Sequence, residues 1–267
     1  MDTEVQVERD RSGVSIPTGA SPVLDLGYVL LTRMTHDIEY DLEDASDGIS
    51  MTMTPSDEVG IVADARVSTG KTAKTYGRSE QRTLEFLLRE DHTSPFRGQV
   101  IQFEIKAPLF VARQWWKYII GSDHNESISR DPFLSWNEMS RRYVETAPEF
   151  YIPYSWRSAP ERRAQGSGGD TPTTTQDWAN YNMESSIGEG MERYHNALAY
   201  GICAEQARLY LPAYAMYTTW RWTVSLQGLC HFLKQRLDST AQSEIQEYAR
   251  AIKSLSLPIW PITIGRF

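Results

Sequence analysis

The segment from residue 99 to residue 121 changes directly from a strand pattern to a helix pattern, and this change limits the possible folds more than any other feature. Apolar and polar residues alternate in Gln99–Lys106 (QVIQFEIK), which predicts a strand with one buried face. Pro108 suits the first position of a helix, and Gly121 is placed to end it. Apolar residues cover much of the circumference of this helix, so it should be central. The pattern predicts an α/β (α+β) domain with a central sheet and helices.

Other segments extend this fold class. Val23–Met34 is rich in β-branched and aliphatic residues and predicts a second strand. Ser79 can cap a helix that runs to Glu90 and carries several leucines on one face. The C-terminal half is expected to be mostly helical. The helices expected there are Tyr181–Tyr200, Cys203–Leu211, Leu226–Leu237 and Thr240–Leu255, the last with a capping box formed by Ser239 and Gln242.

A single domain is expected over residues 23–267, preceded by a flexible tail at residues 1–22. The acidic, turn-rich stretch 43–58 is expected to be a loop. Insertions are expected near residues 122–136 and 156–178, and the second is rich in Gly, Pro, Thr and Ser. We interpret it as an interruption of one domain, because the chain that follows shows no strand pattern for a second sheet.

Composition excludes several classes of protein. The formal net charge of −8 argues against general nucleic-acid binding, although a local basic pocket for a phosphorylated small molecule remains compatible. With only two cysteines, Cys203 and Cys230, no disulfide framework is expected, and a cytoplasmic location fits. The charged N-terminal stretch does not resemble a signal peptide, and no apolar run has the length of a membrane span.

A polar cluster in residues 137–142 is the first candidate site. Glu138, Ser140 and Arg142 alternate along the chain, so an extended segment would direct all three to one side. A carboxylate, a hydroxyl and a guanidinium together suit a nucleotide, because Arg binds phosphate and the other groups bind polar edges. A solvated turn with a local Glu–Arg pair explains the same spacing, and spacing alone does not separate the two.

Two arginines lie in apolar surroundings. Arg208 precedes a Leu-Tyr-Leu-Pro run, and Arg236 lies in an otherwise apolar helix. Arginine is rarely buried without a partner. A buried ion pair, for example between Arg236 and Asp238, is one explanation. An anion pocket formed with Arg142 is the other.

Other chemistries find little support. Cys203 and Cys230 lie in apolar helical contexts and are expected to be small core residues. The five histidines, among them His92 and His231, show no metal-ligand spacing, so no metal site is expected. The dinucleotide motif GxGxxG and the phosphate motif GxxxxGK[ST] are both absent. Ser140 has no histidine nearby in sequence to activate it as a nucleophile.

Several segments together resemble the flavin-dependent thymidylate synthases. They occur in collinear order between about residue 63 and residue 252. The segments are ADARVSTG, KAPLFVARQWW, NEMSRRY, EFYIP, ARLYLP and WTVSLQGLCHFLKQRLDSTAQSEI. The resemblance implies one α/β domain and a homotetramer in which FAD and a nucleotide bind where subunits meet. It also implies methylation of C5 of a uridine nucleotide, with methylenetetrahydrofolate as carbon donor, reduced FAD as hydride donor and NADPH as the usual reductant.

The resemblance also implies roles for individual residues. Arg208 would contact the nucleotide phosphate, Arg236 would polarise the uracil ring, and Glu138 would lie near both nucleotide and flavin. Arg236 and Glu138 are thus the expected catalytic residues. The expected nucleotide-binding set is Gln114, Glu138, Ser140, Arg142, Arg208 and Arg236. The expected cofactor-binding set is Ser68, His92, Ser94, Lys117, Ser225 and His231.

One segment departs from the family. Relatives place Arg-His-Arg after the Gln-Trp segment to hold FAD, whereas this chain has Lys117, Tyr118 and Ile119, so only one positive charge remains. The chain then carries a longer insertion before Asn137. Ser122–Phe133 could fold over the site and replace lost contacts, or it could be a surface loop without a role.

Two classes of function remain open from sequence. The first is a working flavin-dependent methylase, either a housekeeping thymidylate synthase or a specialised enzyme similar to the UMP/dUMP methylase of polyoxin-type nucleoside antibiotic pathways. The changed segment next to the flavin favours the specialised enzyme. The second is a non-catalytic relative that still binds nucleotide. Retention of the whole nucleotide-binding set favours the enzyme.

Overall fold

The structure of the protein is a computed structural model. The structure describes residues 7–9, 15–41, 50–55, 58–71, 73, 76–117, 136–140, 147–160 and 166–267.

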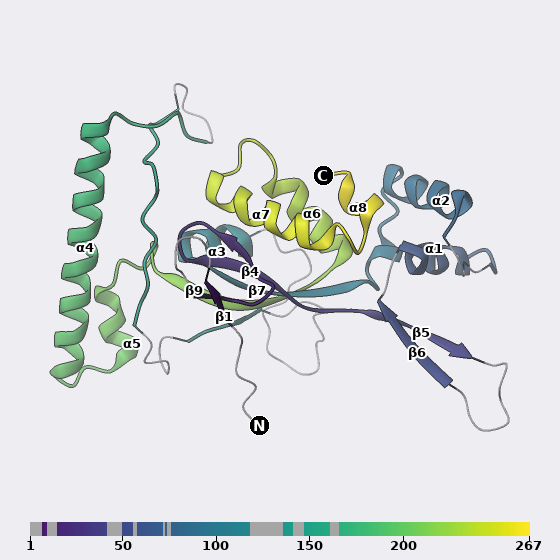
Figure 1. Cartoon of the computed structure of the whole chain (residues 1–267), viewed down its shortest axis with the longest axis horizontal. Coiled ribbons are helices and arrows are strands. Elements are labelled where there is room, and N and C mark those ends of the chain that lie inside the picture. Colours follow the sequence, from purple (N-terminus) through teal and green to yellow (C-terminus); the bar gives the residue numbers. More distant parts are fainter. Residues whose placement is uncertain are drawn as a thin grey trace.

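A five-stranded antiparallel sheet forms the centre of the molecule (Figure 1). Its strand order is β3 (Ser21–Val23), β4 (Gly27–Met34), β7 (Val100–Pro108), β9 (Tyr217–Ser225) and β8 (Trp136–Glu138). β7 and β9 pair along their whole lengths, from Val100 opposite Ser225 to Pro108 opposite Tyr217. These two strands therefore determine the register of the sheet.

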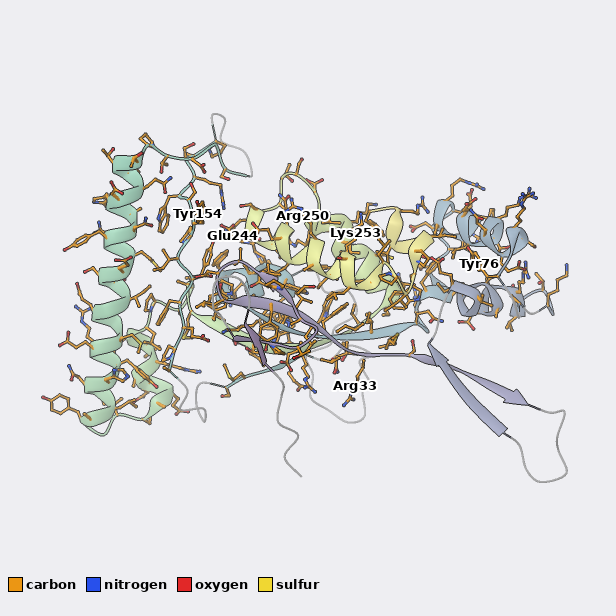
Figure 2. The ribbon with its side chains drawn as sticks, in the orientation of Figure 1. Arg33, Tyr76, Tyr154, Glu244, Arg250 and Lys253 are labelled. Atoms are coloured by element: carbon orange, nitrogen blue, oxygen red, sulfur yellow. The ribbon has the colours of Figure 1, made fainter. Side chains whose placement is uncertain are left out.

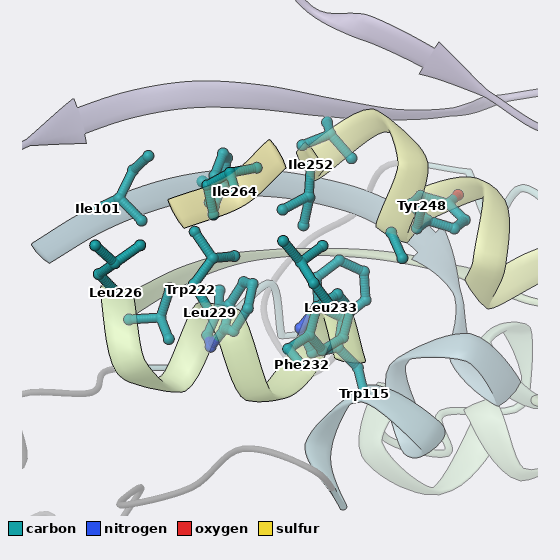
Figure 3. Packing of buried hydrophobic residues seen from close by; sticks show 14 of the residues in the cluster. Ile101, Trp115, Trp222, Leu226, Leu229, Phe232, Leu233, Tyr248, Ile252 and Ile264 are labelled. Carbon is teal, nitrogen blue, oxygen red and sulfur yellow. The ribbon is translucent and has the colours of Figure 1, made fainter. Parts of the chain in front are cut away.

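The core lies between this sheet and helices α3 (Leu109–Trp116), α6 (Leu226–Arg236) and α7 (Ser243–Ser256). The alternation in β7 buries Ile101, Phe103 and Ile105 completely, as a strand with one buried face requires. Trp115 of α3 stacks on Phe232 of α6 with 4.5 Å between the ring centroids (Figure 3). This contact joins the two helices that leave the central strands.

Smaller elements lie at the two ends of the sheet (Figure 1). One end carries α1 (Glu58–Val67), α2 (Arg78–Arg89) and the 3-10 helix η1 (Ser94–Phe96), with α8 (Pro261–Gly265) packed against α2. The opposite end carries the long helix α4 (Thr173–Ala199). The short α5 (Ala204–Ala207) and η2 (Arg208–Tyr210) pack against α4.

Two hairpins complete the described part. β5 (His36–Asp41) pairs with β6 (Ser50–Pro55) and projects away from the sheet, and β1 (Val7–Arg9) pairs with β2 (Ser15–Pro17) (Figure 1). Within the described ranges, no helix combines the length and the apolar character needed to cross a membrane.

Several expectations are confirmed. The strand at Gln99–Lys106 is β7, and Pro108 is the residue before α3. Within the strand expected at Val23–Met34, Gly27–Met34 forms β4, whereas Val23 ends β3 and residues 24–26 form the turn between the two strands. The helix expected to be capped by Ser79 is α2, which begins two residues earlier, with Gly77 as its cap and Arg78 as its first residue. The insertion at 122–136 lies outside the described residues except for Trp136, and so does Gly121.

Other expectations are wrong. The chain after residue 178 does contain a strand, β9, which is central to the sheet; its alternation YTTWRWTVS is hidden because residues on both faces are aromatic or β-branched. Strands β1 and β2 and the first two residues of β3 lie in the tail expected at residues 1–22, and β6 lies in the stretch 43–58 expected to be a loop. Helix α4 begins at Thr173, inside the expected second insertion. The expected capping box is also wrong, since α7 begins after Gln242 without a side-chain cap.

A buried carboxylate attaches α8 to the rest of the fold. Glu58 is 4% exposed, and its Oε1 accepts hydrogen bonds from the backbone N–H groups of Ile262 and Thr263 at 2.9 and 2.6 Å. These donors belong to the first turn of α8, where no partner inside the helix exists. Glu58 therefore supplies the acceptor that this helix end lacks.

We expect Glu58→Ala to lower the free energy of unfolding by about 2–3 kcal/mol, because charge-assisted hydrogen bonds are lost and buried donors become unsatisfied. Urea unfolding followed by circular dichroism would measure the change. Glu85→Ala, on the exposed face of α2, is the matched control and should cost less than about 0.5 kcal/mol. Equal losses in the two variants would contradict this role of Glu58.

Candidate active site

Two of the expected nucleotide-binding residues meet where α3 and α6 end. Arg236, the last residue of α6, is 8% exposed, and its Nη2 donates a hydrogen bond to the backbone carbonyl of Gln114 at 2.6 Å. Asp238, the ion-pair partner considered from sequence, accepts hydrogen bonds from the backbone N–H and the hydroxyl of Thr240. The contact to Gln114 fixes the guanidinium next to α3.

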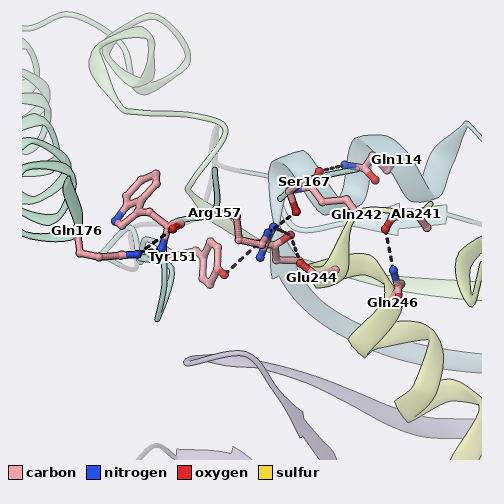
Figure 4. Close-up of polar contacts among 11 residues, drawn as sticks. Gln114, Tyr151, Arg157, Ser167, Gln176, Ala241, Gln242, Glu244 and Gln246 are labelled. Carbon is pink, nitrogen blue, oxygen red and sulfur yellow. Dashed lines mark hydrogen bonds and ion pairs between the residues drawn. The ribbon is translucent and has the colours of Figure 1, made fainter. Parts of the chain in front are cut away.

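The side chain of Gln114 is held by a second contact, to a residue next to α7. Its Nε2 donates to Oε1 of Gln242 at 2.5 Å (Figure 4). Gln242 is the residue before α7. Gln114, Arg236 and Gln242 line one cavity of about 490 Å³, which we call the Arg236 cavity.

Arg157, which lines the Arg236 cavity, is fixed by an ion pair with Glu244. Nη2 of Arg157 lies 2.8 Å from both carboxylate oxygens of Glu244, and Nε of Arg157 donates to Oγ of Ser167 at 2.9 Å (Figure 4). Glu244 is 4% exposed. Burial raises the pKa of Glu244, but the hydrogen bonds and the charge of Arg157 outweigh this effect, so the pKa lies below its ordinary value. The carboxylate is therefore ionised at neutral pH, and it holds Arg157, and through Arg157 the side chain of Ser167, next to the start of α7.

The Arg236 cavity suits a planar, electron-rich ring. A largely buried guanidinium can stabilise negative charge that develops on such a ring, because a low-dielectric site strengthens the interaction. An oriented glutamine amide can donate to and accept from a polar edge. A uracil ring presents both features.

A second group of predicted residues gathers at the other end of the sheet. His92 and His231 line a cavity of about 580 Å³, which we call the His231 cavity. Ser68, His92 and Ser94 line an adjoining cleft, which we call the Ser68 cleft. The cavity and the cleft share Leu87, His92 and Thr93. Four of the six expected cofactor residues therefore surround one continuous region.

The elements that carry these residues explain their positions. Ser68 lies in the turn after α1, and its hydroxyl donates to the carbonyl of Ala65. His92 follows α2 and packs its ring edge against Phe86. Ser225 accepts a hydrogen bond from the N–H of Gly228 and caps α6, so its hydroxyl has a structural role. Lys117 is exposed at the end of α3 and lines neither cavity.

The remaining predicted residues lie elsewhere. Glu138 ends the edge strand β8, and its carboxylate accepts hydrogen bonds from the hydroxyl of Thr218 at 2.8 Å and the indole N–H of Trp136 at 3.3 Å. Ser140 follows as a half-buried residue, and Arg142 lies outside the described residues. The expected extended segment is therefore confirmed only as far as Glu138.

Arg208 differs from the expectation of a buried or pocket-forming arginine. It lies in η2, it is exposed, and its Nε donates to the carbonyl of Glu205 at 3.2 Å. Figure 1 shows α5 and the chain that follows it beside α4, apart from α6. A single chain therefore does not bring Arg208 together with Arg236.

The cysteines also differ from each other. Cys230 packs against the core as expected, and burial raises its pKa to about 12, so it is a neutral thiol at pH 7. Cys203 is exposed, and the prediction that it is a core residue is wrong, because it lies before α5 on the outer side of the molecule. Neither cysteine lines the Arg236 cavity.

The described residues fit a flavin dinucleotide at the His231 cavity. Apolar side chains such as Leu87, Leu88 and Phe96 can contact a ring system, and Lys234 and Arg266 at the same cavity can contact phosphate. Burial and the neighbouring charge of Lys234 lower the pKa of His231, so this imidazole is neutral at pH 7. A neutral imidazole can donate or accept a hydrogen bond with a polar ring edge.

Comparisons with known proteins agree with this arrangement. A family model described as "Thymidylate synthase complementing protein" matches residues 50–262. A flavin-dependent thymidylate synthase from Thermus thermophilus is 37% identical over 246 residues, which cover 92% of this chain and 77% of that protein. Another from Thermosipho africanus is 36% identical over 212 residues, with 79% and 86% covered. The chain belongs to the flavin-dependent thymidylate synthase family.

The fold of this family member is also found in a solved structure. The UMP/dUMP methylase PolB from Streptomyces cacaoi, bound with 5-Br dUMP, superposes with a TM-score of 0.69 at 24% identity. The match covers 91% of this chain and 94% of that chain. The same methylase bound with 5-Br UMP gives a TM-score of 0.68 at 23% identity. These matches confirm the fold.

Sequence reasoning missed several residues that line the cavities. Gln242 lies within a segment that carries the family resemblance, but nothing in its pattern indicates a contact with Gln114. Arg157 lies in a stretch that reads as a plain loop. Lys234 has the pattern of an ordinary exposed lysine on an amphipathic helix. Arg266 lies beyond the segments that resemble the family. Only the fold brings the last two together at one cavity.

We expect Cys203→Ala and Cys230→Ala, singly and together, to retain methylase turnover, because neither sulfur lies at the Arg236 cavity and the Cys230 thiol is protonated. Truncating Cys230 should cost a modest amount of stability, since it packs against the core. Turnover and thermal unfolding would be measured together. Complete loss of turnover in a folded, flavin-loaded double variant would indicate a thiol nucleophile and contradict this arrangement.

Proposed function

We propose that this protein methylates C5 of a uridine nucleotide, UMP or dUMP or both, with methylenetetrahydrofolate as the carbon donor. Its family is one of flavin-dependent methyltransferases, and the reduced FAD supplies the hydride when bound. The observation that carries the proposal is the pairing of Gln114 and Arg236 in one cavity, each fixed by a short hydrogen bond. NADPH is the proposed reductant.

The chain's own residues account for substrate activation. Arg236 is held by the carbonyl of Gln114, so its charge is oriented before the substrate arrives. Directed at the uracil edge, it would stabilise negative charge on the ring as C5 reacts. Gln114, oriented by Gln242, would bind a polar edge of the same ring. Glu138 is proposed to act near both nucleotide and flavin, from the edge strand β8.

We further propose that the enzyme is a homotetramer with sites shared between subunits. Arg208 and Arg236 lie on separate parts of one chain, so a site that contains both needs more than one copy. The end of the molecule that carries Arg208 also exposes large apolar side chains, as interfaces do. They include Trp178, Tyr181, Leu209 and Tyr214, exposed by 67–80%, and the fully exposed Tyr154 (Figure 2).

A specialised role in nucleoside antibiotic biosynthesis is the proposed branch. The supporting observations are the replacement of Arg-His-Arg by Lys117, Tyr118 and Ile119 and the fold shared with PolB. A housekeeping thymidylate synthase is the alternative, which the identity to the Thermus thermophilus enzyme favours. A non-catalytic nucleotide-binding relative is the third possibility, and cytoplasmic location is proposed for all three.

Product analysis separates these branches. The purified protein would be incubated with UMP or with dUMP, each with methylenetetrahydrofolate, FAD and NADPH, and products identified by mass spectrometry. We expect a methylated product, with UMP accepted if the specialised role is correct. Product from dUMP alone would favour the housekeeping enzyme. No product from either nucleotide, in a protein that binds both, would contradict the proposed activity.

We expect Arg208→Ala to weaken nucleotide binding about tenfold or more, because a phosphate–Arg pair is a charge-assisted bond. FAD binding should change much less. Arg250→Ala on α7, an exposed arginine bonded to Gln246, is the matched control (Figure 2). Isothermal titration with dUMP and with FAD would measure both constants. An unchanged nucleotide dissociation constant would overturn the role of Arg208.

A further inference from the structure

Two cations face the His231 cavity without an acidic partner in the described part of the chain. Lys234 on α6 and Arg266 after α8 both line the cavity. Several other cations of the chain are paired, including Arg66 with Glu80, Lys106 with Glu149 and Arg157 with Glu244. For Lys234 and Arg266 the described residues provide no such ion pair. The two charges are therefore available to an anionic ligand.

Both charges influence side chains that line the cavity. The charge of Lys234 contributes to the lowered pKa of His231, and the charge of Arg266 opposes the effect of burial on the thiol of Cys230. His231 and Cys230 are neighbours on α6 and both line the cavity. Asp91 is the one acidic side chain among the described residues that line it. Lys234 and Arg266 thus approach the cavity from two different elements.

The size and shape of the region fit part of a dinucleotide. A volume of about 580 Å³ lies within the range of small-molecule sites. Leu87, Leu88 and Phe96 give an apolar wall, and the Ser68 cleft continues the space past His92. A ligand with a ring system at each end of a diphosphate could extend from one to the other.

A bound diphosphate would need positively charged partners. In relatives the Arg-His-Arg segment supplies positive charge near FAD, and this chain has Lys117, Tyr118 and Ile119 in its place. Lys117 keeps one positive charge of the Arg-His-Arg segment, and it lines neither the His231 cavity nor the Ser68 cleft. We propose that Lys234 and Arg266 bind the diphosphate of FAD. They would replace part of the positive charge that the Arg-His-Arg segment supplies in relatives. This inference rests on the proposed function, since it assumes that FAD is the cofactor.

Arg266 and Lys234 would contact the diphosphate in different ways. The planar guanidinium of Arg266 can bind two phosphate oxygens at once, whereas the ammonium of Lys234 is a point charge that can follow either phosphate. Both side chains are exposed at the rim, so added salt should weaken their contribution. FAD binding by this protein should therefore depend on ionic strength.

The test is a double neutralisation, Lys234→Gln with Arg266→Gln. Flavin-free protein would be titrated with FAD, ADP and riboflavin by calorimetry or by flavin fluorescence. We expect the affinities for FAD and ADP to fall about tenfold or more, because two charge-assisted contacts are lost. The affinity for riboflavin, which has no phosphate, should stay within about twofold of that of the unaltered protein.

The matched control neutralises two cations that line none of these cavities. Arg250→Gln with Lys253→Gln removes the same net charge from α7 and should leave all three affinities unchanged (Figure 2). The charge-retaining pair Lys234→Arg with Arg266→Lys should restore most of the FAD affinity. Thermal unfolding would show that each variant is folded.

The outcomes separate this inference from the proposed function. Unchanged FAD affinity in the Gln variants, with normal FAD binding by the unaltered protein, would overturn the role of Lys234 and Arg266 and leave the proposed function intact. An equal loss for riboflavin would show a structural role and also overturn it. Loss confined to ADP, with FAD unaffected, would show that the two cations bind a nucleotide other than the flavin, and it would also overturn the inference. Failure of the unaltered protein to bind FAD would reject both.

Discussion

The pairing of β7 with β9 is the constraint on which the rest of the structure depends. The two strands run antiparallel along their whole lengths, and each continues directly into a helix, β7 into α3 and β9 into α6. The helices therefore start at opposite ends of the sheet and run back over the same face toward each other. Trp115 and Phe232 meet where they pass, and Gln114 and Arg236 meet where they end. The geometry of the Arg236 cavity follows from a strand register.

The polar contacts around this meeting point support one another. Gln242 and Glu244 both lie at the start of α7, where Gln242 accepts from Gln114 and Glu244 binds Arg157. Arg157 also donates a hydrogen bond to Ser167, and both side chains line the cavity. A buried carboxylate is tolerated because a guanidinium and its hydrogen bonds compensate for the lost hydration. Two residues at the start of α7 thus orient two residues that line the cavity: Gln242 orients Gln114, and Glu244 orients Arg157.

Sequence patterns predicted the parts of the fold that depend on local periodicity. The alternation in β7 and the proline before α3 are local signals, and both are confirmed. β9 was missed because aromatic and β-branched residues occupy both of its faces, which removes the alternation on which a strand prediction depends. The site was predicted residue by residue only where family segments are retained. Arg157, Lys234 and Arg266 could not be predicted, since their partners and cavities are formed by segments distant in sequence.

Helix α6 connects the two candidate ligand regions. Its first turn is capped by Ser225, and Leu226, Leu229, Phe232 and Leu233 bury one face against the sheet. Gln227, Cys230, His231 and Lys234, three and four residues apart, form a second face that lines the His231 cavity. Gln235 and Arg236 leave the last turn toward the Arg236 cavity. One rigid helix, anchored by core packing, therefore sets the separation between the region proposed for the cofactor and the region proposed for the nucleotide. The packing of Phe232 and Leu233 against the sheet therefore fixes the relative position of the two cavities as well as stabilising the fold.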